Sequence, residues 1–220
     1  MHKLINDTEN IPVESMVGIQ SLVDRADFFY CLSRAFLPPP ASWGIEQWSE
    51  PLLDDLKELS ARLGFDSSHV EQALTAEQAR SQSSTLHSEQ PDSWLVEYSR
   101  IFLVPPVPVT LNAGVYLDGA LGGASVQMMR SCYESVGVEP SDGFHDLPDH
   151  VAMQFEFVGW LYQKAADGDH NADARAAEFT REFVAVWLPS LENACQSASE
   201  RYPAAHVFAA LCRLGHSAIQ

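Results

Sequence analysis

The sequence lacks the signatures of common enzymes and of membrane proteins. It contains no Gly-x-x-x-x-Gly-Lys phosphate loop, no Gly-x-Gly-x-x-Gly helix entrance, no Gly-x-Ser-x-Gly nucleophile turn and no His-Glu-x-x-His zinc motif. It also has no apolar run of about 18 residues, the length at which a membrane-spanning helix becomes a candidate. Residues 1–10 are polar rather than charged and then apolar, as an export leader would be. These absences predict a soluble cytoplasmic protein, without stable membrane insertion, that is not an enzyme.

Basic residues are scarce. The chain has 13 Lys and Arg against 30 Asp and Glu, which gives a formal net charge of −17. Such a charge repels nucleic acid and anionic membranes and attracts cationic partners. A surplus of carboxylates also simply keeps a protein soluble, so the charge alone does not identify a partner.

Cysteines are few and scattered. The four of them, Cys31, Cys132, Cys195 and Cys212, form no Cys-x-x-Cys pair and lie among apolar residues at helical spacing. This distribution argues against a disulfide framework and a zinc ribbon. Four free thiols agree with a reducing compartment.

Apolar residues recur at helical spacing through most of the chain, and no strand alternation is evident. A first helix is expected over residues 16–37, ended by three consecutive prolines, and a second carries a leucine stripe that stops at Gly64. Further helices are expected over residues 67–80, 91–103, 126–137, 148–162, 173–188 and 204–214, with Pro189 and Pro203 as breaks. The sequence therefore predicts an all-α fold, a single helical-bundle domain (residues 1–220) of about nine to ten helices.

Three segments fall outside this pattern. Residues 1–15 are expected to be loosely ordered, and residues 81–90 read as a polar connection. Residues 104–123 hold three prolines and four glycines and predict a long ordered loop. Long ordered loops often carry function, so this one is a candidate part of the site.

A cluster of His and Asp residues stands at one expected helix entrance, in the sequence Phe-His-Asp-Leu-Pro-Asp-His of residues 144–150. One hypothesis is a metal-dependent hydrolase in which His145, Asp146, Asp149 and His150 hold an ion that lowers the pKa of a bound water. However, the spacing matches no standard zinc site. Carboxylates at a helix start also satisfy free N–H groups, which favours a structural role and no bound metal.

Three segments together resemble the redox-enzyme maturation chaperones, a family that includes the dedicated chaperones of trimethylamine-oxide and dimethyl-sulfoxide reductases and the nitrate-reductase delta assembly proteins. Residues 97–103, Glu-Tyr-Ser-Arg-Ile-Phe-Leu, are similar to the family's E-Y-x-x-L-F. Residues 105–116 resemble its proline-rich stretch ending in an aromatic residue. Residues 147–157 are similar to its P-D-H-[IL]-x-x-E-L-x-F-[LM], with Gln154 in place of a common glutamate. A late Trp-x-Pro element at residues 187–189 also matches, although Phe183 stands where a histidine is often found.

The resemblance implies an all-helical chaperone that uses no cofactor. Such a protein binds the twin-arginine signal peptide, or a remnant N-terminal segment, of a molybdopterin-dependent catalytic subunit until that subunit's cofactor is inserted. It would act as a monomer or a homodimer. The binding residues that the resemblance assigns are Tyr98, Ile101, Phe102, Tyr116, Asp149 and His150.

In this hypothesis the apolar part of the signal packs on Ile101 and the aromatic residues, Asp149 accepts a hydrogen bond from an arginine, and His150 fixes that carboxylate. Besides the hydrolase, one further alternative stays open. The chain could be a structural subunit that remains in the finished enzyme complex.

Overall fold

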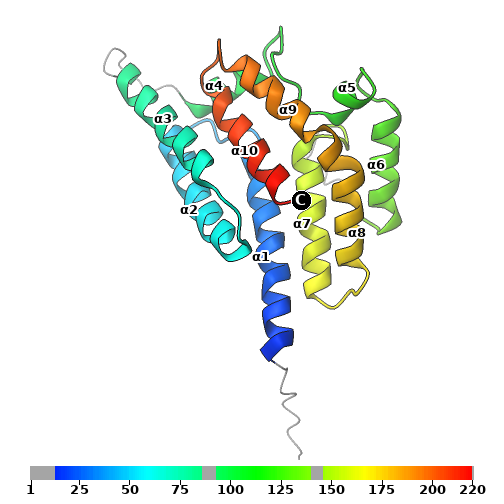
Figure 1. Cartoon of the computed structure of the whole chain (residues 1–220). Helices are drawn as coiled ribbons and strands as arrows, with labels where there is room; N and C mark the ends of the chain where they lie inside the picture. The colour runs from blue at the N-terminus through cyan, green and yellow to red at the C-terminus, as the bar shows by residue number, and fades with distance from the viewer. Residues whose placement is uncertain (1–12, 86–92, 140–145, 220) are drawn as a thin grey trace, which may run out of the picture.

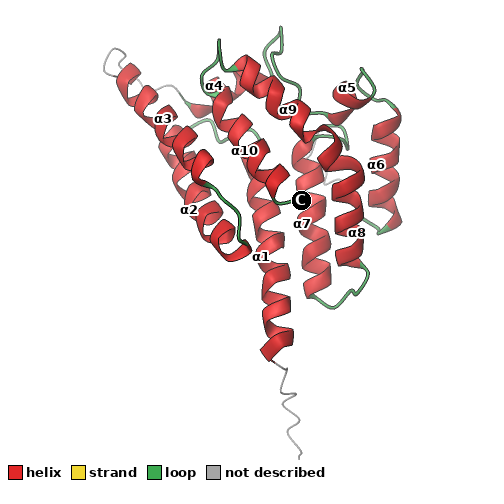
Figure 2. Ribbon diagram, in the orientation of Figure 1, coloured by secondary structure: helices red, strands yellow, loops and turns green. Residues whose placement is uncertain are grey.

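The computed structural model describes residues 13–85, 93–139 and 146–219. Within these ranges every regular element is helical, apart from one isolated antiparallel bridge between Asn112 and His150 (Figure 2), and this confirms the all-α prediction. The helices are α1 (Val13–Ala35), α2 (Ile45–Leu63), α3 (Ser68–Thr85), α4 (Trp94–Phe102), α5 (Ala113–Leu117), α6 (Ala124–Ser135), α7 (Val151–Ala166), α8 (Ala172–Phe179), the π-helical turn η1 (Thr180–Val184), α9 (Ala185–Ala198) and α10 (Ala205–Ser217). None of the helices in these ranges is long and apolar enough to cross a membrane.

Helices α1 and α7 form the centre of the molecule and run in opposite directions (Figure 1). The ring of Phe29 stacks on Tyr162 with centroids 5.9 Å apart, and Phe36 lies 6.0 Å from Phe155. Gly159 allows the helices to approach closely, because a Cβ at this position would lie 3.0 Å from a backbone carbonyl oxygen of α1. A side chain at Gly159 would therefore push the two central helices apart.

The other helices pack around this pair. Helix α2 packs on α1 and α3, α3 on α10, α8 on α7, and α9 on α10. The ring of Phe208 on α10 ties several of them together, since it contacts Trp48 from α2 and Trp94, Tyr98 and Phe102 from α4. This aromatic cluster fixes α4, which carries the first of the resemblance segments, against the core.

The expected boundaries agree with the structure at several helix ends. Helix α1 ends just before the three prolines, and Gly64 caps α2 in the left-handed conformation with φ 81°. The helix expected to begin at Pro91 starts at Trp94 instead, because Ser93 accepts a hydrogen bond from the backbone N–H of Leu95 and caps it.

Two expectations about breaks were wrong. Helix α3 continues to Thr85 instead of ending at residue 80, and Gln82 donates to Glu46 on α2, so polar residues of this segment find tertiary partners. The rest of the expected connection, residues 86–90, lies outside the described residues. Pro189 does not end a helix but lies inside α9. The irregularity in this stretch is instead the π-helical turn η1, which directly precedes α9.

Candidate functional site

Helix α4 turns its aromatic face toward the core. Tyr98 and Ile101 are buried, and the Tyr98 hydroxyl donates to the backbone carbonyl of Phe36 at 2.9 Å. Burial raises the pKa of Tyr98 far above its ordinary value, so this hydroxyl stays protonated. Phe102 is nearly buried, and its ring lies 4.9 Å from that of Tyr98. The end of α1 and the aromatic face of α4 are thereby held in one fixed arrangement.

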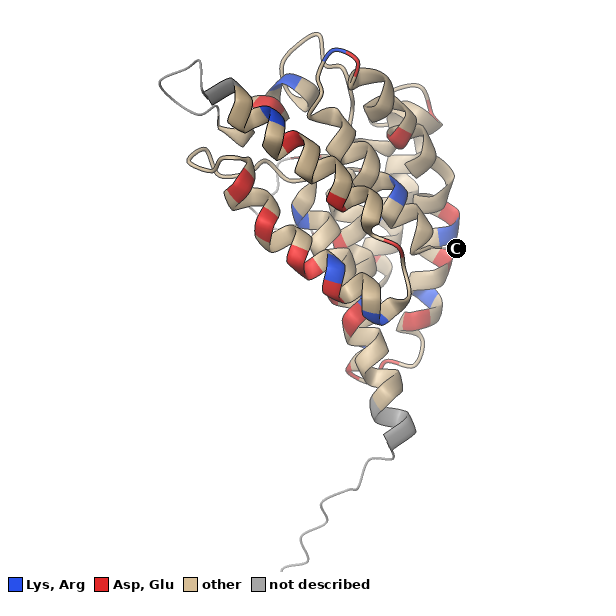
Figure 3. Ribbon diagram, turned by 60° about the vertical axis from the view of Figure 1, so that its left-hand side comes forward, with Lys and Arg blue, Asp and Glu red and all other residues tan. Residues whose placement is uncertain are grey.

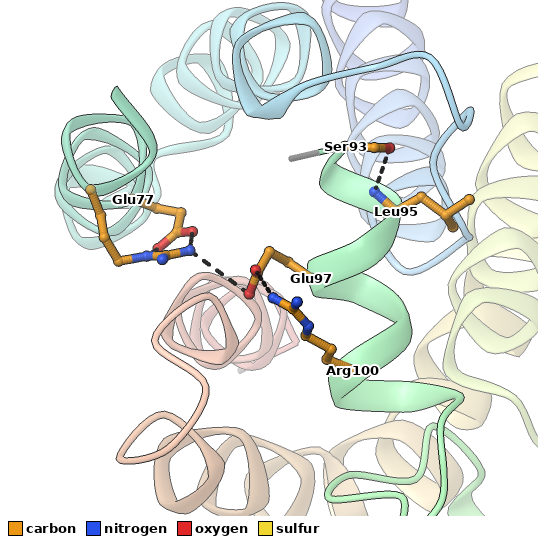
Figure 4. Close-up of polar contacts among 6 residues, drawn as sticks. Glu77, Ser93, Leu95, Glu97 and Arg100 are labelled. Carbon is orange, nitrogen blue, oxygen red and sulfur yellow. Dashed lines mark hydrogen bonds and ion pairs between the residues drawn. The ribbon is translucent and has the colours of Figure 1, made fainter. Parts of the chain in front are cut away.

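Glu97, the first residue of the segment 97–103 that resembles the chaperone family, belongs to a separate network of charged side chains (Figure 4). Glu97 accepts from Arg100 at 2.8 Å and lies 3.8 Å from Arg80, which also pairs with the buried Glu77. These contacts join α4 to α3. Glu97 is therefore an anchor between helices rather than a group that faces the aromatic side of α4.

Asp149 is fully buried and its carboxylate is occupied by donors of the chain itself. Its Oδ1 accepts from the side-chain amide of Asn112 at 3.1 Å, and its Oδ2 accepts from the backbone N–H of Gly114 at 2.7 Å. Its backbone carbonyl accepts from Gln154 at 2.7 Å and from the N–H of Ala113 at 3.1 Å. Asp149 thus locks the Pro/Gly loop onto the start of α7.

Gly114 allows a close approach at this contact. A Cβ at this position would lie 3.0 Å from Asp149 Oδ2 and 3.0 Å from the backbone oxygen of Ala120. A side chain at this position would force the carboxylate or the loop to shift by a few tenths of an ångström, so glycine favours the close approach of the backbone N–H. Residues 104–123 contain the short helix α5.

A buried amide continues the network to α9. Gln154 accepts from the indole N–H of Trp187 at 3.0 Å while its amide nitrogen donates to Asp149. An amide satisfies both neighbours because it offers one donor and one acceptor group. The Tyr116 ring stacks on Trp187 with centroids 5.5 Å apart, and its hydroxyl donates to the carbonyl of Thr110 at 2.9 Å. Trp187 is fully buried in the core.

His150 caps helix α7. Its Nδ1 accepts from the backbone N–H of Ala152 at 3.1 Å, so the proton of the neutral ring resides on Nε2. That nitrogen lies 3.9 Å from Asp146 Oδ2. Burial lowers the pKa of His150 below its ordinary value, although Asp146 and Asp149 act in the opposite direction. The ring is therefore neutral at pH 7.

Residues from all three segments that resemble the chaperone family, 97–103, 105–116 and 147–157, line one cavity of about 350 Å³, which we call the signature groove. Its walls include Leu37, Tyr98, Phe102, Leu103, Asp146 and His150. The groove is mainly apolar and joins the end of α1, the end of α4 and the entrance of α7. Leu103 is its most exposed apolar wall, with 52% of its surface accessible.

The structure brings together only part of the expected site. Tyr98, Phe102 and His150 line the signature groove, whereas Ile101 and Asp149 lie behind it in the core and Tyr116 lies against α9. Both oxygens of Asp149 are engaged, so this geometry does not offer it to an incoming arginine.

The carboxylate that faces the groove is Asp146, with 45% of its side chain exposed. Its Oδ1 accepts from the Asn112 amide at 3.1 Å and from the backbone N–H of Leu147 at 2.6 Å, so Oδ2 is the oxygen that can accept from a ligand. The sequence places Asp146 in the metal hypothesis or in a structural role at a helix start, and not among the binding residues. It also missed Leu37 and Leu103, which give no signal beyond being apolar residues just beyond helix ends.

The metal alternative gains no geometric support. His145 lies outside the described residues, and in the described part of the chain no group of three or more His, Cys, Asp or Glu side chains could hold a metal ion. Asp149 and the Nδ1 atom of His150 are both occupied by hydrogen bonds from the chain. Their lone pairs serve the fold rather than a ligand sphere.

Comparison with known proteins identifies the family. The nitrate reductase delta subunit family model matches residues 47–193, a range that includes all three segments that line the signature groove. The chain belongs to this family. The match confirms the resemblance to the redox-enzyme maturation chaperones.

Individual relatives agree with this assignment. Chaperone protein TorD of Vibrio cholerae is 29% identical over 114 residues, which cover 49% of this chain and 50% of the relative. Chaperone protein TorD of Vibrio vulnificus is 27% identical over 88 residues, covering 37% and 41%. The chain spans about half the length of the curated relatives it matches. These relatives are chaperones, in agreement with the expectation that the chain is not an enzyme.

A solved structure of a candidate redox enzyme maturation protein from Archaeoglobus fulgidus is also similar. It covers 89% of this chain and 91% of its own, with 16% identity and a TM-score of 0.48.

Proposed function

We propose that the chain is a cytoplasmic maturation chaperone that binds the N-terminal segment of a molybdenum-containing oxidoreductase precursor. This segment is the twin-arginine signal peptide where the client has one, and it is held during cofactor insertion and before export or assembly. The chaperone names of the relatives support the proposal. The observation that carries it is the signature groove, where segments far apart in the sequence form one apolar cavity.

Binding in this groove requires no covalent chemistry. The apolar part of the client segment packs mainly on Leu103 and Leu37, over a floor formed by the buried Tyr98 and Phe102. Burial contributes roughly 25 cal/mol per Å² of apolar surface removed from water. Asp146 accepts from a basic side chain of the client, but an exposed ion pair contributes only about 0 to 1 kcal/mol. Most of the affinity therefore comes from apolar contact.

The remaining expected residues act indirectly. Asp149 holds the loop to α7, and Tyr116 supports the loop through its stacking on Trp187. Ile101 belongs to the core under α4. We assign these residues positioning roles, and we keep His150 as both a groove wall and the cap of α7.

The test is capture of the client from cells of the native organism with a tagged chain. Wild-type protein should recover a molybdoenzyme precursor that retains its N-terminal segment. Leu103→Glu should lose this capture because it places a charge on the apolar wall. Val104→Glu is the matched control, since Val104 is equally exposed, at 54%, but does not line the groove. Equal capture by both variants, or recovery of only the mature enzyme, would refute the proposal.

A further inference from the structure

A larger cavity lies beside the signature groove. It has a volume of about 710 Å³, is formed by α1, α2 and α7, and shares Leu37 as a wall with the signature groove. Its charged walls are Asp27, Arg34, Asp55, Glu58, Arg62 and Glu156, and we call it the acidic groove. Figure 3 shows acidic residues recurring along the helix α2 that forms one side.

Both arginines of the acidic groove are already committed to carboxylates. Arg34 lies 3.4 Å from Asp55. Arg62 pairs with Glu58 and lies 3.0 Å from the buried Asp24. Both arginines are therefore paired with acidic residues of the chain itself. They do not neutralise the other two carboxylates of the groove, Asp27 and Glu156.

Asp27 and Glu156 face the groove from α1 and α7 without a basic partner. Among the described residues, no Lys, Arg or His nitrogen lies within ion-pair distance of either carboxylate. Tyr30 also lines this groove. Burial raises the pKa of the Tyr30 phenol, and the negative charges of Glu156, Asp27 and Asp167 raise it further. This region therefore carries uncompensated negative charge next to an aromatic face, an arrangement that suits a guanidinium or ammonium group.

Ser33 provides an independent sign of a ligand. Only 4% of its surface is exposed, and it lines the same groove. Its hydroxyl makes no hydrogen bond within the described part of the chain, so it is available to a group in the groove. A donor or acceptor placed in the groove would satisfy it.

We propose that the acidic groove binds the basic side chains that precede the apolar run of the client segment, while that apolar run occupies the signature groove. This inference rests on the proposed function, because it assigns the second half of the same segment. The shared wall at Leu37 makes the two grooves adjacent, and the charge of the acidic groove complements arginine or lysine. Asp146 then has a secondary role at the apolar end.

The test uses two labelled synthetic peptides with the same apolar run, preceded by two arginines in one and by two glutamines in the other. Fluorescence anisotropy at low salt measures their dissociation constants for the wild-type chain and for the Asp27→Asn/Glu156→Gln variant. The matched control is Glu50→Gln/Asp54→Asn. It removes the same two charges from exposed positions of α2 that do not line the groove.

The arginine peptide should bind the groove variant about threefold to tenfold more weakly than wild type, as expected for the loss of two partly exposed ion pairs. Its affinity for the control, and the affinity of the glutamine peptide for all three proteins, should stay nearly constant. If the groove variant and the control weakened binding of the arginine peptide equally, the inference would be overturned, because the loss of net charge would then explain the weaker binding.

Unchanged affinity of the arginine peptide for the groove variant would also overturn the inference, while leaving the proposed function intact. If neither peptide bound the wild-type chain, the proposed function would fail together with the inference. Should the groove instead receive a second copy of this chain, the groove variant would change the sedimentation coefficient and not the peptide affinity. That result would likewise contradict the proposal.

Discussion

The junction between the Pro/Gly loop and the start of α7, which we call the Asp149 corner, and the acidic groove both contain carboxylates. The carboxylates of the two regions have opposite roles. At the corner the carboxylate is fully buried and accepts from the loop through Asn112 and Gly114. In the acidic groove Asp27 and Glu156 are exposed and have no basic partner among the described residues. A polar group that is saturated by its own chain stabilises the fold, whereas one that is left open can bind a partner. The most specific sequence motif of this chain is therefore part of the scaffold of the site more than of its contact surface.

The largest difference that we expect between the two regions is in how much the loss of a carboxylate lowers the stability of the fold. Asp149→Ala should lower the free energy of unfolding by about 2 to 4 kcal/mol, because it leaves the buried N–H of Gly114 without an acceptor and removes one of the two acceptors of the Asn112 amide, the other being Asp146. Urea denaturation followed by circular dichroism measures this difference. Asp27→Ala is the control and should change stability by less than about 0.5 kcal/mol, as exposed substitutions usually do. Similar losses in the two variants would break the comparison.

A smaller effect concerns pH. The folded-state pKa of His150 is depressed by burial, so the unfolded chain takes up this proton first as the pH falls below about 6.5. Stability is therefore lost as the pH falls from the unfolded pKa toward the lower folded pKa, and it is regained above that window.

His150→Asn removes the titration and keeps an acceptor for the N–H of Ala152. Denaturation at a series of pH values should show a shallower decrease of stability in the variant than in the wild type. Part of the slope should remain, because burial also lowers the pKa of His69. An unchanged slope would contradict the assignment of a neutral, buried His150.

The fold was largely predictable from the sequence because its signals are local. Apolar periodicity, the proline stop after α1 and the capping Gly64 each act within one or two turns of helix. The errors arose where tertiary structure overrides these signals. Pro189 lies inside α9, and the polar end of α3 is held by a contact with α2.

The site was only half predictable. Of the residues that the resemblance assigns, Tyr98, Phe102 and His150 line one groove, but the resemblance could not show that Asp149 is buried in the core. Burial of a carboxylate depends on donors from a different segment, and the pattern around residue 149 does not contain them. The acidic groove gave no sequence signal, because Asp27 and Glu156 come from helices that are distant in the chain and adjacent only after folding.

The most direct test of the central claim is amide hydrogen exchange of the chain with and without the arginine peptide. We expect slower exchange over residues 27–37 and 98–112, where the two grooves share the wall at Leu37. Exchange over α6 and α8 should not change. Protection confined to the separate cavity between Cys132 and Phe183 would contradict the account, since that cavity belongs to neither groove.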